Sequence, residues 1–336
     1  MVPQNFAGKV SHFFVTAILV CWSSLACAEE ETLTLVSSWN SRQNFTAHFL
    51  KYVDSVNKAG KGIVQIKFLG GPSVIPQRQL LYALRRGVID MAFGGMTYYR
   101  GVVPEGDAMF AGTITPMEAR ANGGFDALQP YWEERINARL VGWMQSGLGP
   151  NFYLSDPPTF GPDGILDLPG RIIRTSPTNV ELIESVNARP VQIAVKEIYT
   201  AFQRGAVEGL VWPIIGFPDL GIDEFVHYRV DPDVLQLAIT LQMNLDRWNA
   251  LSPEARLILT EQAIIYEQVS RMDLFEIRDR EVAELDAAGF KSIELEPEVA
   301  ERWRQHAHQV VWDRFELRSP ESAAKLKPLF FPEGLK

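Results

Sequence analysis

The chain has 336 residues, of which 46% are hydrophobic and 22% charged, and its formal net charge at pH 7 is −9. That balance is typical of a folded globular protein and excludes a disordered or collagen-like chain. Nucleic-acid-binding proteins normally carry a basic surplus, so the acidic total argues against a nucleic-acid partner. At roughly 100–200 residues per domain, the length favours two domains.

The N-terminal segment 1–28 has the pattern of a secretory signal peptide. Lys9 is its single Lys or Arg, an apolar run covers residues 13–22, and Ala26-Cys27-Ala28 precedes three glutamates. A charged start, a short apolar stretch and an A-x-A site together predict cleavage after Ala28 and export. The alternative is a buried N-terminal helix. The run is too short to cross a membrane, which takes about 20 apolar residues, and no later stretch is apolar enough to do so.

Both cysteines, Cys21 and Cys27, lie inside this segment. The mature chain is therefore expected to have no disulfide, no cysteine-based zinc site and no thiol nucleophile. Residues 24–27, Ser-Leu-Ala-Cys, also weakly resemble a lipoprotein signal, which would make Cys27 a lipid anchor.

The mature chain begins with alternating strand and helix patterns. Alternating or continuous apolar residues predict strands, apolar residues at helical spacing predict helices, and glycines end them. The expected order is strand 33–36, helix 45–58, strand 63–68, helix 77–86 and strand 88–93. This order predicts a mainly parallel sheet with helices packed on it.

A similar unit recurs after residue 170. Residues 186–193 have the pattern of a loop followed by a strand, residues 196–204 that of a helix and residues 206–211 that of another strand. A further strand pattern, at residues 172–174, lies between the two units. Arg86-Gly87-Val88-Ile89-Asp90 matches Arg204-Gly205-Ala206-Val207-Glu208 in residue type. The match is either chance or the mark of two lobes built on one α/β plan, and the second reading is the more economical.

Strands are also expected at 141–143 and 152–154, and the apolar run 234–244 can cross between lobes. Ser252, Pro253 and Glu254 are a typical helix start, and the helical pattern continues to a stop at Gly289. At 1.5 Å per residue this helix is roughly 50 Å long, enough to span both lobes. A last helix is expected near 297–315. We expect a first lobe of residues 29–150 plus 232–252, and a second of 151–231 plus 253–336.

Arg174 is the strongest candidate for a binding residue. It stands at the end of a predicted strand and precedes Thr175-Ser176-Pro177. A guanidinium at such a place suits bidentate capture of a carboxylate, and the alternative is a salt bridge to a neighbouring Asp or Glu.

Aromatic residues follow the other predicted strands. Trp39, the pair Tyr98 and Tyr99, and Trp212 stand at or after strand ends, and Phe152 lies in the strand after the first lobe. Ligands of open α/β folds bind at the carboxyl ends of strands, so these side chains are expected to line a ligand cleft. The alternative for each is the ordinary core.

Motifs for catalysis are absent from the sequence. No H-E-x-x-H, G-x-S-x-G, P-loop or G-x-G-x-x-G pattern occurs, and we expect neither a metal nor a cofactor. The alternative, an exported two-lobed enzyme, would rely on Asp90 or Glu208. Because these acids occupy matching positions in the two repeats, a structural role is favoured for both.

Several stretches together resemble one family. These are residues 168–174, Leu-Pro-Gly-Arg-Ile-Ile-Arg; residues 187–191, Asn-Ala-Arg-Pro-Val; residues 198–209, Ile-Tyr-Thr-Ala-Phe-Gln-Arg-Gly-Ala-Val-Glu-Gly; and residues 251–254, Leu-Ser-Pro-Glu, before the long helix. In this combination the chain resembles the solute-binding proteins of TRAP transporters, the DctP-like family, over essentially the whole mature chain.

The resemblance implies a two-lobed, type II-like periplasmic binding protein without enzymatic activity. Each lobe would be a mixed sheet flanked by helices, a long helix would brace both, and Arg174 would anchor the carboxylate of a small organic acid. The implied partners are the membrane TRAP subunits, and we expect a monomer. A sensor input protein that binds the same ligand class is a further alternative.

The chain differs from other members of this family around the expected pocket. Trp212 stands where sialic-acid-type members offer Asn, Val211 stands where some members have a metal-binding Glu, and residues 147–152 lack the Arg of many members. These differences predict a more aromatic pocket. We therefore expect a monocarboxylate with an apolar or cyclic part, rather than sialic acid or a C4-dicarboxylate.

Overall fold

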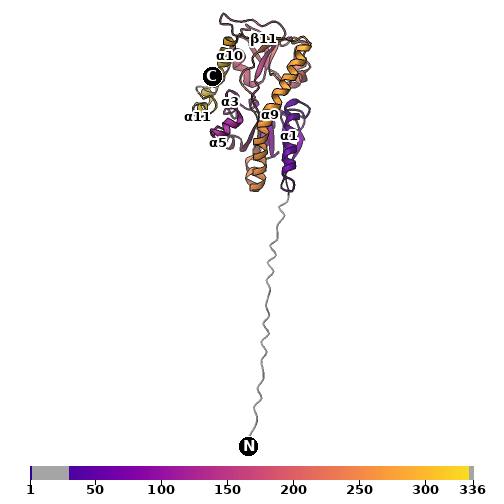
Figure 1. The fold of residues 1–336 in the computed structure, drawn as a ribbon, viewed down its shortest axis with the longest axis vertical. Coiled ribbons are helices and arrows are strands. Elements are labelled where there is room, and N and C mark those ends of the chain that lie inside the picture. Colours follow the sequence, from indigo (N-terminus) through magenta and orange to yellow (C-terminus); the bar gives the residue numbers. More distant parts are fainter. Residues whose placement is uncertain (2–29, 333–336) are drawn as a thin grey trace.

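The protein consists of two β-sheets with helices around them, and a computed structural model describes Met1 and residues 30–332 (Figure 1). The predicted signal peptide and the possible lipid anchor at Cys27 lie outside the described residues. Within the described residues, no helix is both long and apolar enough to cross a membrane.

The first sheet has the strand order β2-β1-β3-β10-β4. Its strands are β1 Glu31–Ser37, β2 Val64–Gly70, β3 Met91–Gly95, β4 Ala138–Gln145 and β10 Ile239–Asn244. β1 pairs parallel with β2 and β3, whereas β10 is antiparallel to β3 and β4. The predicted parallel core is confirmed, but the strand expected from residue 88 begins only at Met91. Val88 still belongs to the preceding turn, since its N–H donates to the Ala83 carbonyl and its side chain is exposed.

The second sheet has the order β11-β9-β5-β8-β6-β7. Its strands are β5 Pro150–Leu154, β6 Ile172–Thr175, β7 Arg189–Gln192, β8 Gly209–Pro213, β9 Tyr228–Asp231 and β11 Lys291–Glu294. β6 pairs parallel with β7 and β8, and β5 is antiparallel to β8. The chain passes from the first sheet to the second between β4 and β5 and returns between β9 and β10. The predicted crossing of residues 234–244 and the two mixed sheets are therefore confirmed.

The helices flank these sheets. They are α1 Asn44–Ala59, α2 Leu80–Arg85, α3 Gly106–Phe110, α4 Pro116–Ala121, α5 Gly124–Ile136, α6 Val180–Glu184, α7 Ile198–Gln203, α8 Leu245–Ala250, α9 Pro253–Ala287, α10 Pro297–Arg318 and α11 Pro320–Phe330. Short 3-10 turns occupy Gln77–Gln79, Met96–Tyr98, Pro177–Asn179, Val195–Glu197 and Pro218–Leu220. The last helix was expected to stop near residue 315, and the structure adds α11 after it.

The long helix α9 runs beside both sheets, as Figure 1 shows. The Ser252 hydroxyl accepts a hydrogen bond from the Ala255 N–H at 3.1 Å, which confirms the predicted helix start. Leu259 and Ala263 pack in the core of the first sheet, and Leu285 packs in that of the second. The 35 residues of α9 thus brace both halves of the molecule. The exact lobe boundaries stay a prediction, and α9 contributes to both cores.

The two repeats share hydrogen bonds as well as residue types. Gly87 and Gly205 both have positive φ, +68° and +63°, where a glycine ends the helix and turns the chain toward the next strand. The Asp90 carboxylate then accepts from the Thr34 N–H at 2.7 Å, and the Glu208 carboxylate accepts from the Ile172 N–H at 2.9 Å. One α/β plan therefore builds both halves.

Candidate functional site

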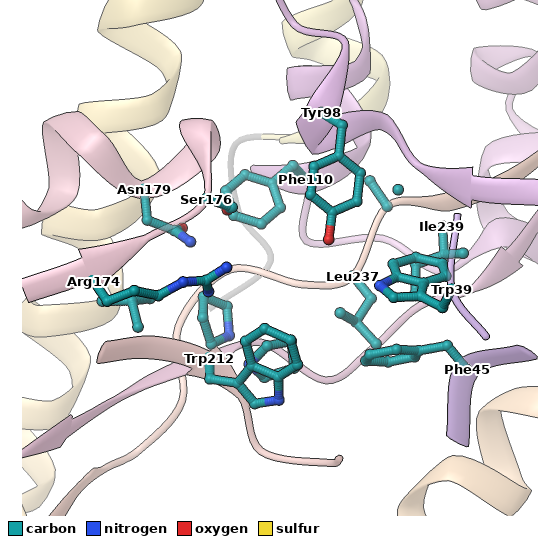
Figure 2. A pocket seen from close by; sticks show the side chains of 15 residues that line it. Trp39, Phe45, Tyr98, Phe110, Arg174, Ser176, Asn179, Trp212, Leu237 and Ile239 are labelled. Carbon is teal, nitrogen blue, oxygen red and sulfur yellow. The ribbon is translucent and has the colours of Figure 1, made fainter. Parts of the chain in front are cut away.

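A chamber with a volume of about 60 Å³ lies between the two sheets. Residues on the strands of both sheets, and on the turns and helices next to them, form its wall (Figure 2). They are Trp39, Phe45, Gly95, Tyr98, Phe110, Leu237, Ala238 and Ile239 with the first sheet, and Pro150, Arg174, Ser176, Asn179, Val211, Trp212 and Pro213 with the second. A wider hollow of about 840 Å³ shares Trp39, Tyr98, Arg174 and Ser176 with the chamber, so these four lie where the two spaces meet.

Arg174, on β6, is held by the main chain. Its Nε and Nη2 donate to the Ile193 carbonyl oxygen at 3.0 and 2.8 Å, and its guanidinium carbon lies 5.3 Å from the centre of the Trp212 ring. A guanidinium has five N–H donors in one plane. Because Ile193 occupies the Nε–Nη2 edge, the Nη1–Nη2 end stays available for two parallel hydrogen bonds to a carboxylate.

The guanidinium of Arg174 has no carboxylate partner among the described residues, although the side chain is only 3% exposed. The alternative that Arg174 makes an internal salt bridge is therefore wrong for this part of the chain. Burial lowers the pKa of Arg174 to about 10, which leaves it charged at neutral pH. Since a buried unpaired charge is costly, this place favours a bound anion.

Three of the aromatic candidates lie in the chamber wall: Trp39, Tyr98 and Trp212. Trp39 and Tyr98 pack edge to face, with ring centres 6.0 Å apart, on the side opposite Arg174 in Figure 2. The structure thus brings four of the six predicted residues together.

Tyr99 and Phe152 are not among the residues that line the chamber. The Tyr99 hydroxyl donates to the Gln77 carbonyl at 2.6 Å, and its ring is buried in the core. Phe152 is 2% exposed and packs against Trp303 of α10, at 5.8 Å between ring centres. The prediction that Tyr99 and Phe152 line the cleft is therefore corrected: each side chain points into the core beside its own turn or strand.

Other chamber residues were missed. Phe110 of α3 and Asn179 lie away from the strand ends used for the prediction, although Asn179 follows Arg174 by only five residues. Phe45 was assigned to the apolar face of a helix, and Leu237 and Ile239 to a crossing segment. Their residue types are those of an ordinary core, so the sequence held no signal that they meet a ligand space.

The two acids of the enzyme alternative lie outside the chamber. Asp90 binds the Thr34 main chain and hydroxyl, and Glu208 binds the Ile172 main chain. Both act within the repeat. Within the described residues, no three His, Cys, Asp or Glu side chains are grouped so that they could hold a metal ion.

Comparison with known proteins adds to this geometry. A family model described as bacterial extracellular solute-binding protein, family 7 (DctP), matches residues 35–318. A solute-binding protein of Roseobacter denitrificans is 21% identical over 290 residues, which cover 84% of this chain and 87% of that protein.

Solved structures share the fold. A TRAP periplasmic solute-binding protein from a Sulfitobacter species with bound β-D-galacturonate has a TM-score of 0.74 at 18% identity, covering 89% of this chain and 99% of its own. One from Desulfovibrio salexigens with bound orotic acid has a TM-score of 0.75 at 17% identity, covering 89% and 97%. One from Bordetella bronchiseptica, described as a dimer with calcium and picolinate, has a TM-score of 0.76 at 17% identity, covering 90% and 91%.

Proposed function

The chain belongs to the bacterial extracellular solute-binding proteins of family 7, and on that premise we propose that it is the receptor of a TRAP transporter for a small organic acid. It captures the acid in the chamber between the two sheets and delivers it to the membrane subunits of the transporter. It does so as a binding protein, without turnover.

The observation that carries this proposal is the buried guanidinium of Arg174, which lacks a carboxylate partner among the described residues and has one free end at the chamber. A carboxylate there would neutralise the charge and complete its hydrogen bonds. The ligands named for the similar structures, galacturonate, orotic acid and picolinate, are all carboxylic acids, which supports this class.

The position of the chamber explains how binding would be linked to closure. Arg174 and Trp212 lie on strands of the second sheet, whereas Trp39 and Tyr98 follow strands β1 and β3 of the first. A ligand that contacts both sets favours the arrangement in which they face each other, and so stabilises a closed form. We expect the membrane subunits to recognise that form.

Export follows from the same proposal. Cleavage of segment 1–28 after Ala28 would release the receptor into the periplasm, where we expect a monomer. Edman sequencing or mass spectrometry of the exported protein tests the cleavage, and an N-terminus at Cys27 would indicate a lipoprotein instead.

The test is a thermal-shift and calorimetric screen of the protein from Glu29 onward against small carboxylic acids. A ligand that binds only the folded state at 100 times its Kd adds about 2.7 kcal/mol of stability. We expect stoichiometric binding without product formation, lost in Arg174→Met. Turnover of the ligand, or binding that does not depend on Arg174, would contradict the proposal.

A further inference from the structure

We propose that the ligand is a compact monocarboxylate with an apolar, ring-like body and a second polar group that hydrogen-bonds to the Tyr98 hydroxyl across the chamber from Arg174. This inference rests on the proposed function and names the substrate class and a specificity-determining residue of the same site.

The charge of the chamber wall limits the number of carboxylates that a ligand can carry. Of the fifteen residues that line the chamber, Arg174 alone is charged. A second carboxylate placed in the chamber would have no cationic partner there, and an unpaired anion in a desolvated site costs binding energy. The wall therefore favours a monocarboxylate over a dicarboxylate.

The rest of the wall decides the body of the ligand. Phe45, Phe110 and Trp212 contribute aromatic rings, and Leu237 and Ile239 contribute aliphatic side chains. Figure 2 shows these groups surrounding the space between Arg174 and Tyr98. Besides Arg174 and Tyr98, the polar side-chain groups of the wall are Ser176, Asn179 and the indole N–H groups of Trp39 and Trp212. A body with many hydroxyl groups would lose more hydrogen bonds to water than these few groups replace, whereas a ring with few polar atoms loses little.

The second polar contact comes from the side opposite Arg174. The Tyr98 hydroxyl projects into the chamber in Figure 2. Beside it, Trp39 Nε1 is buried and turned toward the same space, and it makes no hydrogen bond of normal length among the described residues. An indole N–H can only donate a hydrogen bond. A buried indole N–H without a partner therefore favours a ligand that brings an acceptor to this side of the chamber.

Tyr98 and Arg174 also interact electrostatically. Burial raises the pKa of Tyr98, and the positive charge of Arg174 acts against that rise. The hydroxyl and the guanidinium both line the chamber, so a ligand can contact both at once. Since Tyr98 follows β3 of the first sheet and Arg174 lies on β6 of the second, this contact would also link the identity of the ligand to closure.

The experiment compares benzoate with 3- and 4-hydroxybenzoate by isothermal titration. One added hydrogen bond of about 1 kcal/mol strengthens binding about fivefold. We expect one hydroxybenzoate to bind about fivefold more tightly than benzoate, and in Tyr98→Phe we expect that hydroxybenzoate and benzoate to bind with equal affinity. Succinate and galacturonate should bind at least about tenfold more weakly.

Tyr99→Phe is the matched control, because its hydroxyl binds Gln77 outside the chamber, and it should keep the gain. Trp39→Phe, which removes the indole N–H, should reduce the gain if folding is intact by circular dichroism. A gain that persists in Tyr98→Phe overturns the inference. So does binding of succinate or galacturonate that is tighter than the binding of benzoate and of its two hydroxy derivatives. Arg174-dependent binding of galacturonate alone would overturn the inference and leave the proposed function standing, whereas no Arg174-dependent binding of any carboxylate would overturn both.

Discussion

The two strand–helix units that begin each half of the molecule share a scaffold and differ in what they place on it. Thr34 and Ile172 occupy the same position, since each donates its N–H to the acid that follows the glycine turn. Two residues further along each strand, the first half has Val36 and the second has Arg174. Val36 is buried in the core, whereas Arg174 presents its free end to the chamber.

The neighbouring strand shows a similar difference. Four residues after the acid, β3 has Gly94 and β8 has Trp212. A side chain at Gly94 would collide with Ser38, so the first half needs a glycine there, whereas Trp212 covers the guanidinium of Arg174. One scaffold thus serves two roles: the second half supplies the charge with Trp212 over it, and the first half supplies Trp39 and the hydroxyl of Tyr98.

The largest expected effect comes from replacing Arg174 with an apolar residue, as its counterpart Val36 is in the first half. Arg174→Met should weaken carboxylate binding by about 1,000-fold, because a buried charged hydrogen-bond partner is lost. Without ligand, the melting temperature should stay the same or rise, since a desolvated charge without a carboxylate partner is removed. Calorimetric titration and thermal denaturation measure the two quantities. A large loss of stability without ligand would show that Arg174 is part of the scaffold rather than of the site.

The next effect tests how the halves are joined. Arg314 of α10 donates to Asp107 of α3 at 2.7 and 2.9 Å and to Glu181 of α6 at 2.9 Å. Arg314→Met should cost about 3–5 kcal/mol, because it leaves the buried carboxylate of Asp107 without its partner. Arg304→Gln, which removes a 3.8 Å pair with Glu301 on the surface, should cost under about 1 kcal/mol. Urea denaturation compares them, and equal effects would contradict a role of Arg314 in joining α3 and α6.

A smaller effect distinguishes the two repeat acids. Asp90 accepts from both the N–H and the hydroxyl of Thr34, at 2.7 Å each, whereas Glu208 accepts one hydrogen bond from Ile172 and is more exposed. Asp90→Ala should cost about 1–3 kcal/mol of folding free energy and Glu208→Ala about 0.5–1 kcal/mol. Ligand affinity measured in parallel should change in neither variant. Turnover of a ligand by the unmodified protein that is lost in either variant would instead support the enzyme alternative.

The smallest effect should be equal in the two halves. Gly87→Ala and Gly205→Ala each place a side chain at positive φ with no heavy atom closer than 3.9 Å, so only the backbone is strained. We expect a loss of about 1 kcal/mol in each. Gly101→Ala is the control, because its φ is not in the left-handed region and its surroundings are open, and it should be neutral. Clearly unequal losses at Gly87 and Gly205 would break the equivalence of the two turns.

Local signals in the sequence were enough to predict most of the elements and to single out Arg174. Alternation, helical spacing, glycine stops and the Ser252 cap are local signals, and they located most strands, both repeats and α9. The strand pattern at residues 172–174 put Arg174 near the end of a strand, and the alternation of side chains along a strand limits the direction in which its side chain can point. Trp39, Tyr98 and Trp212 could be found in the same way.

Which aromatic side chains line the chamber depends on the tertiary structure. Tyr98 and Tyr99 are adjacent and alike in sequence, yet one faces the chamber and the other bonds to Gln77 in the core. Phe152 packs on α10, and Phe110 enters the chamber from α3. The physical reason is that burial of an apolar ring has no direction of its own. Contacts between segments far apart in the chain decide whether a ring fills the core or lines the cleft.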